Sequence, residues 1–74
     1  MYTITMTLPS GVIYCWNPNE KWIEAKPQMW TQGEMIRELQ RIMRQIPTMS
    51  NHTVIHVINA KTWVCRVKIE INRD

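Results

Sequence analysis

The stretch Thr31–Ile46, TQGEMIRELQRIMRQI, decides the fold of this 74-residue chain, because all of its local signals indicate one helix. Thr31 and Glu34 have the spacing of a capping box, in which each side chain bonds the backbone amide of the other. Pro47 opposes any continuation, so we expect a helix over about 32–46. The apolar residues recur at the spacing of one buried helical stripe. They are Met35, Ile36, Leu39, Ile42, Met43 and Ile46.

The opposite side of this helix carries a row of arginines. At about 100° per residue, Arg37, Arg41 and Arg44 fall close together and face away from the stripe. One interpretation is a solvated surface, on which Glu34 and Glu38 pair weakly with the arginines. The other is a ridge that binds phosphates or acidic side chains through planar guanidinium groups.

Strands are predicted on both sides of the helix. Their expected ranges are 2–8, 12–16, 53–58 and 62–71, and a third short strand at 21–25 competes with one irregular loop from Asn17 to Trp30. In the first, Thr3, Thr5 and Thr7 alternate with apolar residues, and we expect these threonines on a solvent-facing side. The last strand alternates in the same way. We expect its core-facing residues to be Trp63, Cys65, Val67, Ile69 and Ile71, and its outward residues to be Val64, Arg66, Lys68 and Glu70.

The element order β-β-(β)-α-β-β predicts an α+β fold. One helix stripe against one face of an antiparallel-rich sheet of four or five strands gives a two-layer sandwich, and 1–74 is expected to be a single domain. Two hairpins joined by a helix resemble the β-grasp order, in which the first and last strands pair in parallel at the centre. In that order Cys15 and Cys65 lie too far apart for a disulfide, and we expect both to be small buried residues.

Composition limits the function classes only weakly. The net charge of +3 and the pI near 9.2 permit an acidic or nucleic-acid partner without requiring one. No apolar run approaches the length of a membrane span, and residues 1–8 lack the features of a signal peptide. We therefore expect a complete cytoplasmic protein that does not enter a membrane.

The sequence holds no strong motif for reaction chemistry. No phosphate-binding glycine loop, zinc spacing or cofactor signature is present, so we expect neither a metal nor a cofactor. His56 could act as a base only if the fold brings it near Cys15 or Cys65. A half-buried structural histidine is the simpler interpretation, and we expect the protein not to be an enzyme.

Binding to another protein is the function that the sequence favours. Trp16 and Trp22 flank the turn Asn17-Pro18-Asn19, and tryptophan and arginine are enriched among interface anchors. The candidate contact residues are Trp16, Trp22, Arg37, Arg41, Arg44, Arg66 and Lys68. If the helix arginines form the contact, replacing Arg37, Arg41 and Arg44 with Glu should abolish it without unfolding the chain.

Two alternatives stay open for the partner. A small basic protein could bind nucleic acid, with arginines tracking phosphates and Trp22 stacking on a base. An exposed sheet edge could also pair with a second copy to form a homodimer. Small stand-alone chains without motifs look like accessory or inhibitor proteins of phages and other mobile elements, including anti-CRISPR proteins, and we expect this class.

Overall fold

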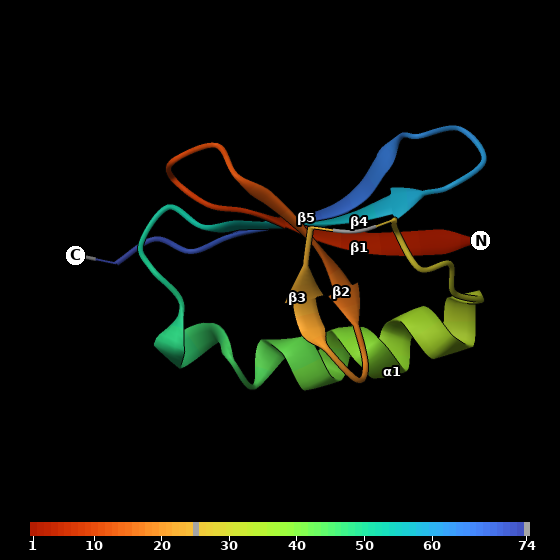
Figure 1. Ribbon diagram of the computed structural model, residues 1–74, viewed down its shortest axis with the longest axis horizontal. Helices are drawn as coiled ribbons and strands as arrows, with labels where there is room; N and C mark the ends of the chain where they lie inside the picture. The colour runs from red at the N-terminus through yellow and green to blue at the C-terminus, as the bar shows by residue number, and fades with distance from the viewer. Residues whose placement is uncertain (25, 74) are drawn as a thin grey trace.

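The fold is a small α+β sandwich with one helix and one antiparallel sheet. The computed structural model describes residues 1–24 and 26–73, and the elements follow each other as expected (Figure 1). The strands are β1 Tyr2–Thr7, β2 Ile13–Asn17, β3 Lys21–Ile23, β4 Val54–Asn59 and β5 Cys65–Glu70. The helix α1, Gln32–Met43, is followed by a 3₁₀ turn, η1, at Ile46–Thr48. Within the described residues, no helix has both the length and the apolar character that crossing a membrane requires.

The sheet has the strand order β3-β2-β1-β4-β5, and every neighbouring pair is antiparallel. The β-grasp order is therefore wrong, since β1 pairs with β4 and β5 lies at an edge. The direction of the helix explains this order. Trp30 bridges to Tyr2, and α1 then runs in the same direction as β1 (Figure 1). A strand that starts near the end of α1 must therefore return antiparallel to β1.

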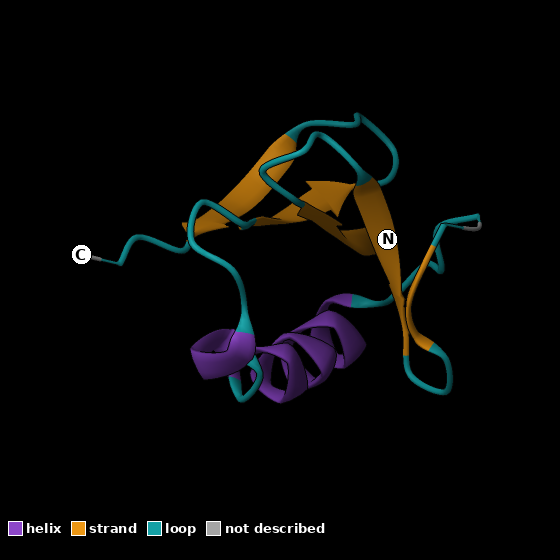
Figure 2. Cartoon of the chain, turned by 60° about the vertical axis from the view of Figure 1, so that its left-hand side comes forward, coloured by secondary structure: helices purple, strands orange, loops and turns teal. Residues whose placement is uncertain are grey.

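One face of the sheet carries the core, and α1 covers that face only (Figure 2). Cross-strand partners share a face, so the pairs Ile4–Val57 and Met6–Ile55 both point towards the helix. Buried apolar side chains from every layer meet there. They are Ile4, Met6, Trp16, Trp30, Met35, Ile42, Met49, Ile55, Val57 and Ile71.

The helix is rotated about its axis relative to the predicted stripe. Met35 and Ile42 are buried, but Ile36 and Met43 are 46% and 49% exposed. Glu38, expected on the surface, is only 8% exposed. The β2–β3 hairpin turns down beside α1 (Figure 1) and brings its tryptophans against the side of the helix that carries Glu38. The opposite side of the apolar stripe is left uncovered.

Both ends of α1 illustrate how local sequence sets its limits. The expected capping box is present, with Thr31 and Glu34 each bonding the other's backbone amide. The expected end at Ile46 is wrong, because the helix ends at Met43 with Arg44 as its C-cap. Pro47 lies in the first turn of η1, and the chain between the two helices keeps right-handed backbone angles at Arg44 and Gln45, so α1 passes into a tighter 3₁₀ turn.

The strand limits differ from the predicted ranges by one to three residues. β1 ends at Thr7, β2 and β4 are displaced by one residue, and β3 spans Lys21–Ile23. The predicted end of that third strand, Ala25, lies outside the described residues. β5 begins three residues later than expected, at Cys65, because the preceding residues form a turn.

The central strand buries its threonines, which contradicts the expected solvent-facing side. Thr3 is 1% exposed and Thr5 is 8% exposed. Thr5 lies on the central strand between Cys15 on β2 and His56 on β4, and the neighbouring strands on both sides cover its short side chain. Small side chains at the middle of a sheet can thus be buried without a second layer above them.

Candidate functional site

The β4–β5 turn holds Trp63, one of three non-glycine residues in the described part of the chain with a left-handed backbone, the others being Lys21 and His52. The Asn59 side chain accepts hydrogen bonds from the amides of Lys61 and Thr62, at 2.9 and 3.3 Å, and tightens the turn. Trp63 then adopts a left-handed backbone with φ of 58°. This conformation costs a residue other than glycine about 1–2 kcal/mol. Its indole is nevertheless 61% exposed, and the neighbouring Val64 is 62% exposed.

Other exposed groups lie near the exposed side chains of Trp63 and Val64 in the sequence or through backbone contacts. Met1 is 59% exposed, and its carbonyl accepts a 2.9 Å hydrogen bond from the amide of Ala60 in the turn. Arg66 lies over the Tyr2 ring, 5.5 Å from its centroid, and donates to the Tyr2 hydroxyl. We call the set Met1, Lys61, Trp63, Val64 and Arg66 the hairpin tip. It combines exposed apolar side chains with two cations: Arg66, which is held against Tyr2, and Lys61, which lies in the turn.

The core-facing prediction for Trp63 and Cys65 is therefore wrong, and so is the prediction that Cys65 is buried. Strict alternation assigned both to the inner face, but the turn and a register shift at Val57/Ile58 interrupt the ladder. From Val67 onwards the alternation holds, since Val67 and Ile69 are partly buried and Ile71 is buried. The Asn at position 59, which favours turns, was the available signal for a longer connection.

The helix arginines do not form one uniform ridge. Arg41 bonds Glu38, with 3.1 Å between nitrogen and oxygen, and its guanidinium lies 5.9 Å from the centroid of the Trp16 ring. Arg37 and Arg44 are exposed. Arg41 is thus engaged with Glu38 and Trp16 although its side chain is partly exposed, whereas Arg37 and Arg44 are exposed; the role of all three in binding stays a prediction.

The two tryptophans of the β2–β3 hairpin have mainly structural contacts. Trp16 is 1% exposed and donates from Nε1 to Glu38 at 2.9 Å, so a partner cannot reach its indole in this structure. Trp22 is half-buried and donates from Nε1 to Gln45 at 3.2 Å. The two rings meet edge to face, with centroids 4.9 Å apart. Trp22 therefore presents only part of its surface outside.

Arg66 and Lys68 are both exposed, but their side chains lie on different sides of the sheet. Lys68 is the cross-strand partner of His56, on the face opposite to Ile55 and Val57. Arg66 instead stacks on Tyr2, which alternation places on the same side as Ile4. The prediction that Arg66 and Lys68 form one basic face of the last strand is therefore wrong.

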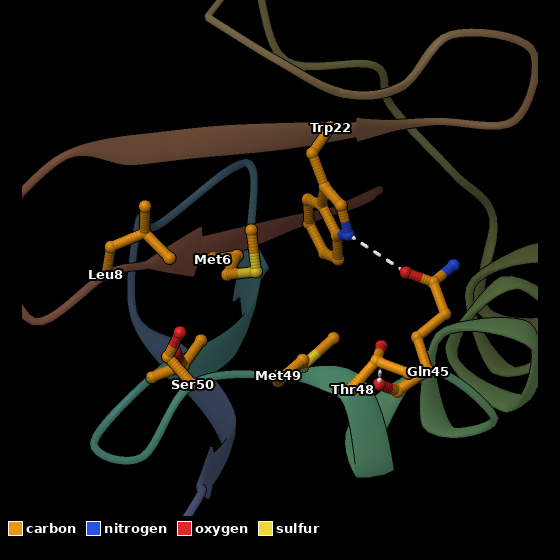
Figure 3. A pocket seen from close by; sticks show the side chains of 8 residues that line it. Met6, Leu8, Trp22, Gln45, Thr48, Met49 and Ser50 are labelled. Carbon is orange, nitrogen blue, oxygen red and sulfur yellow. Dashed lines mark hydrogen bonds between the residues drawn. The ribbon is translucent and has the colours of Figure 1, made fainter.

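A cavity of about 230 Å³ opens between the sheet and the end of the helix (Figure 3). Trp22 reaches across it towards Gln45, and Met6 and Met49 face the same space. Leu8, Thr48, Ser50 and Thr53 complete the lining. These side chains include no acid, no base and no thiol, so they suit a small neutral group and supply no acid–base chemistry. No sequence motif pointed to this cavity.

The residues considered for catalysis lie on the opposite side of the sheet. His56 pairs with Thr5 on one side and Lys68 on the other. Cys15 lies beyond Thr5, so two interstrand spacings, roughly 10 Å, separate its Cα from that of His56. Cys15 and Cys65 are free thiols, and burial raises the pKa of the Cys15 thiol. Cys15 is therefore too far from His56 for the contact that a catalytic histidine–thiol pair would require.

Comparisons of the chain with models of protein families, with curated proteins and with solved structures found no match. The features that bear on function are therefore those of the fold itself, its exposed side chains and the left-handed backbone at Trp63.

Proposed function

We propose that this chain is a protein-binding domain that acts by contact and uses the hairpin tip as its anchor. The observation that carries the proposal is Trp63, a large apolar side chain that is exposed to solvent and has a left-handed backbone. Sparsely populated backbone conformations persist where the surrounding structure fixes them, and they cluster at binding sites. Tryptophan is also among the residues that contribute most to interface affinity when buried.

The surroundings of Trp63 suggest the character of the partner surface. Val64 and Met1 extend the apolar contact, while Lys61 and Arg66 add positive charge at its border. The net charge of +3 points in the same direction. The complementary surface is an apolar pocket bordered by acidic side chains, which would draw the tip in and fix its orientation.

Nucleic-acid binding is the second candidate, favoured by an exposed indole beside Lys61 on one loop. Bases of single strands stack on aromatic side chains, and nearby cations contact the phosphates. The distribution of the arginines weighs against it, because Arg41 and Arg66 are engaged within the protein. This candidate predicts affinity for mixed oligonucleotides that falls steeply as salt rises.

Affinity capture from the native host, followed by mass spectrometry, tests the proposal when wild type is compared with two variants. Trp63→Asn removes the indole but keeps a residue that tolerates left-handed backbone. Ile13→Thr is the matched control, since Ile13 is 56% exposed on the distant β2 strand. We expect Trp63→Asn to lose the captured protein and Ile13→Thr to retain it.

Equal capture by Trp63→Asn and wild type would overturn the role of the tip. A double variant, Arg37→Glu with Arg44→Glu, tests the helix arginines while leaving the contacts of Arg41 with Glu38 and Trp16 in place. The narrower expectation of a phage or mobile-element inhibitor belongs to the same proposal. The identity of the captured protein decides it.

A further inference from the structure

The outer edge of β5 carries backbone groups that are ready to pair. Ile71 donates its amide hydrogen to Thr53, on the β4 side. Backbone groups alternate in direction along an antiparallel strand, so Val67 and Ile69 also point to β4. Lys68 and Glu70 therefore point their N–H and C=O groups outwards. Among residues 1–24 and 26–73, no backbone group bonds to them from that side.

The side chains of this edge are complementary to themselves. Val67-Lys68-Ile69-Glu70-Ile71 has an apolar residue at its centre and opposite charges at equal distances on either side. We propose that β5 pairs antiparallel with β5 of a second copy of this chain, about a two-fold axis at Ile69. Each Lys68 then lies opposite Glu70 of the second copy, and the two isologous halves make the same contacts.

The alternative registers are less favourable. An axis at Lys68 places two lysines directly opposite each other, and an axis at Val67 pairs Lys68 with Arg66 of the second copy. An axis at Glu70 opposes two glutamates. Directly opposed like charges destabilise a strand pair, whereas opposite charges stabilise it. Only the axis at Ile69 pairs Lys68 and Glu70 with opposite charges and leaves no like pair between them.

The helix side of the same strand supports this occupant. Val67 and Ile69 point towards the core but are only partly buried, since β5 lies at the sheet edge, beyond β4 from the strand β1 on which α1 packs. In the proposed dimer, Ile69 meets Ile69 of the second copy and Val67 lies opposite Ile71. The other sheet edge, β3, has three residues and no self-complementary charge pattern. The pairing is therefore specific to one edge.

This self-association goes beyond the proposed function and does not depend on it. The dimer uses Val67 to Ile71, whereas Trp63 and Val64 of the hairpin tip precede the start of β5. A strand pair of this length covers less area than the roughly 1,000 Å² typical of stable interfaces. We therefore expect a dimer whose population depends on protein concentration.

Sedimentation velocity across a concentration series, micromolar to millimolar, tests the dimer with a charge exchange. Lys68→Glu places two pairs of glutamates opposite each other. We expect the association constant to fall by roughly tenfold or more. Lys68→Glu with Glu70→Lys restores both opposite pairs, so its association should return to nearly the wild-type value. Lys21→Glu on the β3 edge is the matched control and should associate like wild type.

A second variant addresses the backbone groups. Lys68→Pro removes an outward N–H, and proline is tolerated on edge strands at such positions. It should be monomeric, whereas Lys68→Thr keeps the N–H and should retain part of the association. Circular dichroism of each variant checks that the fold is intact. A monomeric wild type at every concentration, or Lys68→Glu associating like wild type, would overturn the proposal.

Discussion

Replacing Glu38 with Leu should destabilise the protein by about 2 kcal/mol, because it removes the hydrogen-bond acceptor of the buried Trp16 indole. Glu38 accepts the hydrogen bond from the buried Trp16 indole at 2.9 Å. A hydrogen bond to a charged group contributes about 1.5–3 kcal/mol, and removing only the acceptor leaves a buried N–H without a partner. The loss of the Arg41 ion pair adds little, because the Arg41 side chain is 42% exposed. Leu and Glu have similar helix propensities.

Urea denaturation at neutral pH measures this effect. A domain of this length has a free energy of unfolding of about 4–11 kcal/mol, so the expected loss is a large fraction of it. With a slope of about 1 kcal/mol/M, the midpoint should fall by about 2 M. Gln40→Leu is the matched control on the exposed side of α1 and should change stability by less than about 0.5 kcal/mol.

A double-mutant cycle separates the hydrogen bond from packing. Trp16→Phe removes the N–H, so Glu38→Leu should cost less in that background than in wild type. The expected coupling is about 1–2 kcal/mol. If Glu38→Leu costs no more than Gln40→Leu, or if the two substitutions are additive, the assignment of Glu38 as an interior acceptor is refuted.

Three further changes test other parts of the fold. Thr53→Val removes a buried hydroxyl without a protein partner among the described residues, and urea midpoints should show a gain of about 1 kcal/mol; a loss would mean that the hydroxyl is satisfied. The Thr31 amide and hydroxyl lower the pKa of Glu34, so this carboxylate stabilises the fold above its unfolded-state pKa and the contribution is lost as pH falls through the folded-state pKa. Glu34→Gln should flatten that acidic decline in urea midpoints, and a decline parallel to wild type would contradict it. A thiol reagent followed by mass spectrometry should modify exposed Cys65 faster than Cys15, and equal rates would contradict the burial of Cys15.

Local signals in the sequence predicted the elements well. The capping box at Thr31 and Glu34 depends only on neighbouring residues, and the structure confirms it. The two-layer α+β arrangement follows from one apolar stripe and several alternating strands, and it is confirmed as well. These features need no knowledge of how distant parts of the chain meet.

Features that depend on distant contacts were not predictable in the same way. Ile36 and Glu38 exchange their expected environments because the β2–β3 hairpin packs on one side of α1, which periodicity cannot reveal. Trp63 fits an alternating pattern in sequence, yet a turn begins four residues earlier at Asn59 and removes it from the sheet. The strongest candidate site residue was therefore assigned to the core by the rule that worked for Ile71.

The position of β1 in the sheet has a consequence for how the chain folds during synthesis. β1 is the central strand, but it is the earliest in the chain, and its partner β4 begins only at Val54. Because synthesis proceeds from the N-terminus, the β1–β2–β3 meander and α1 can form while one side of β1 still lacks its neighbour. During that interval the exposed side of β1 can pair with other nascent chains. The last part of the sequence ends this exposure by adding β4 and β5 to the sheet. Substitutions that slow the formation of the β4–β5 turn should therefore increase aggregation before they alter the stability of the finished fold.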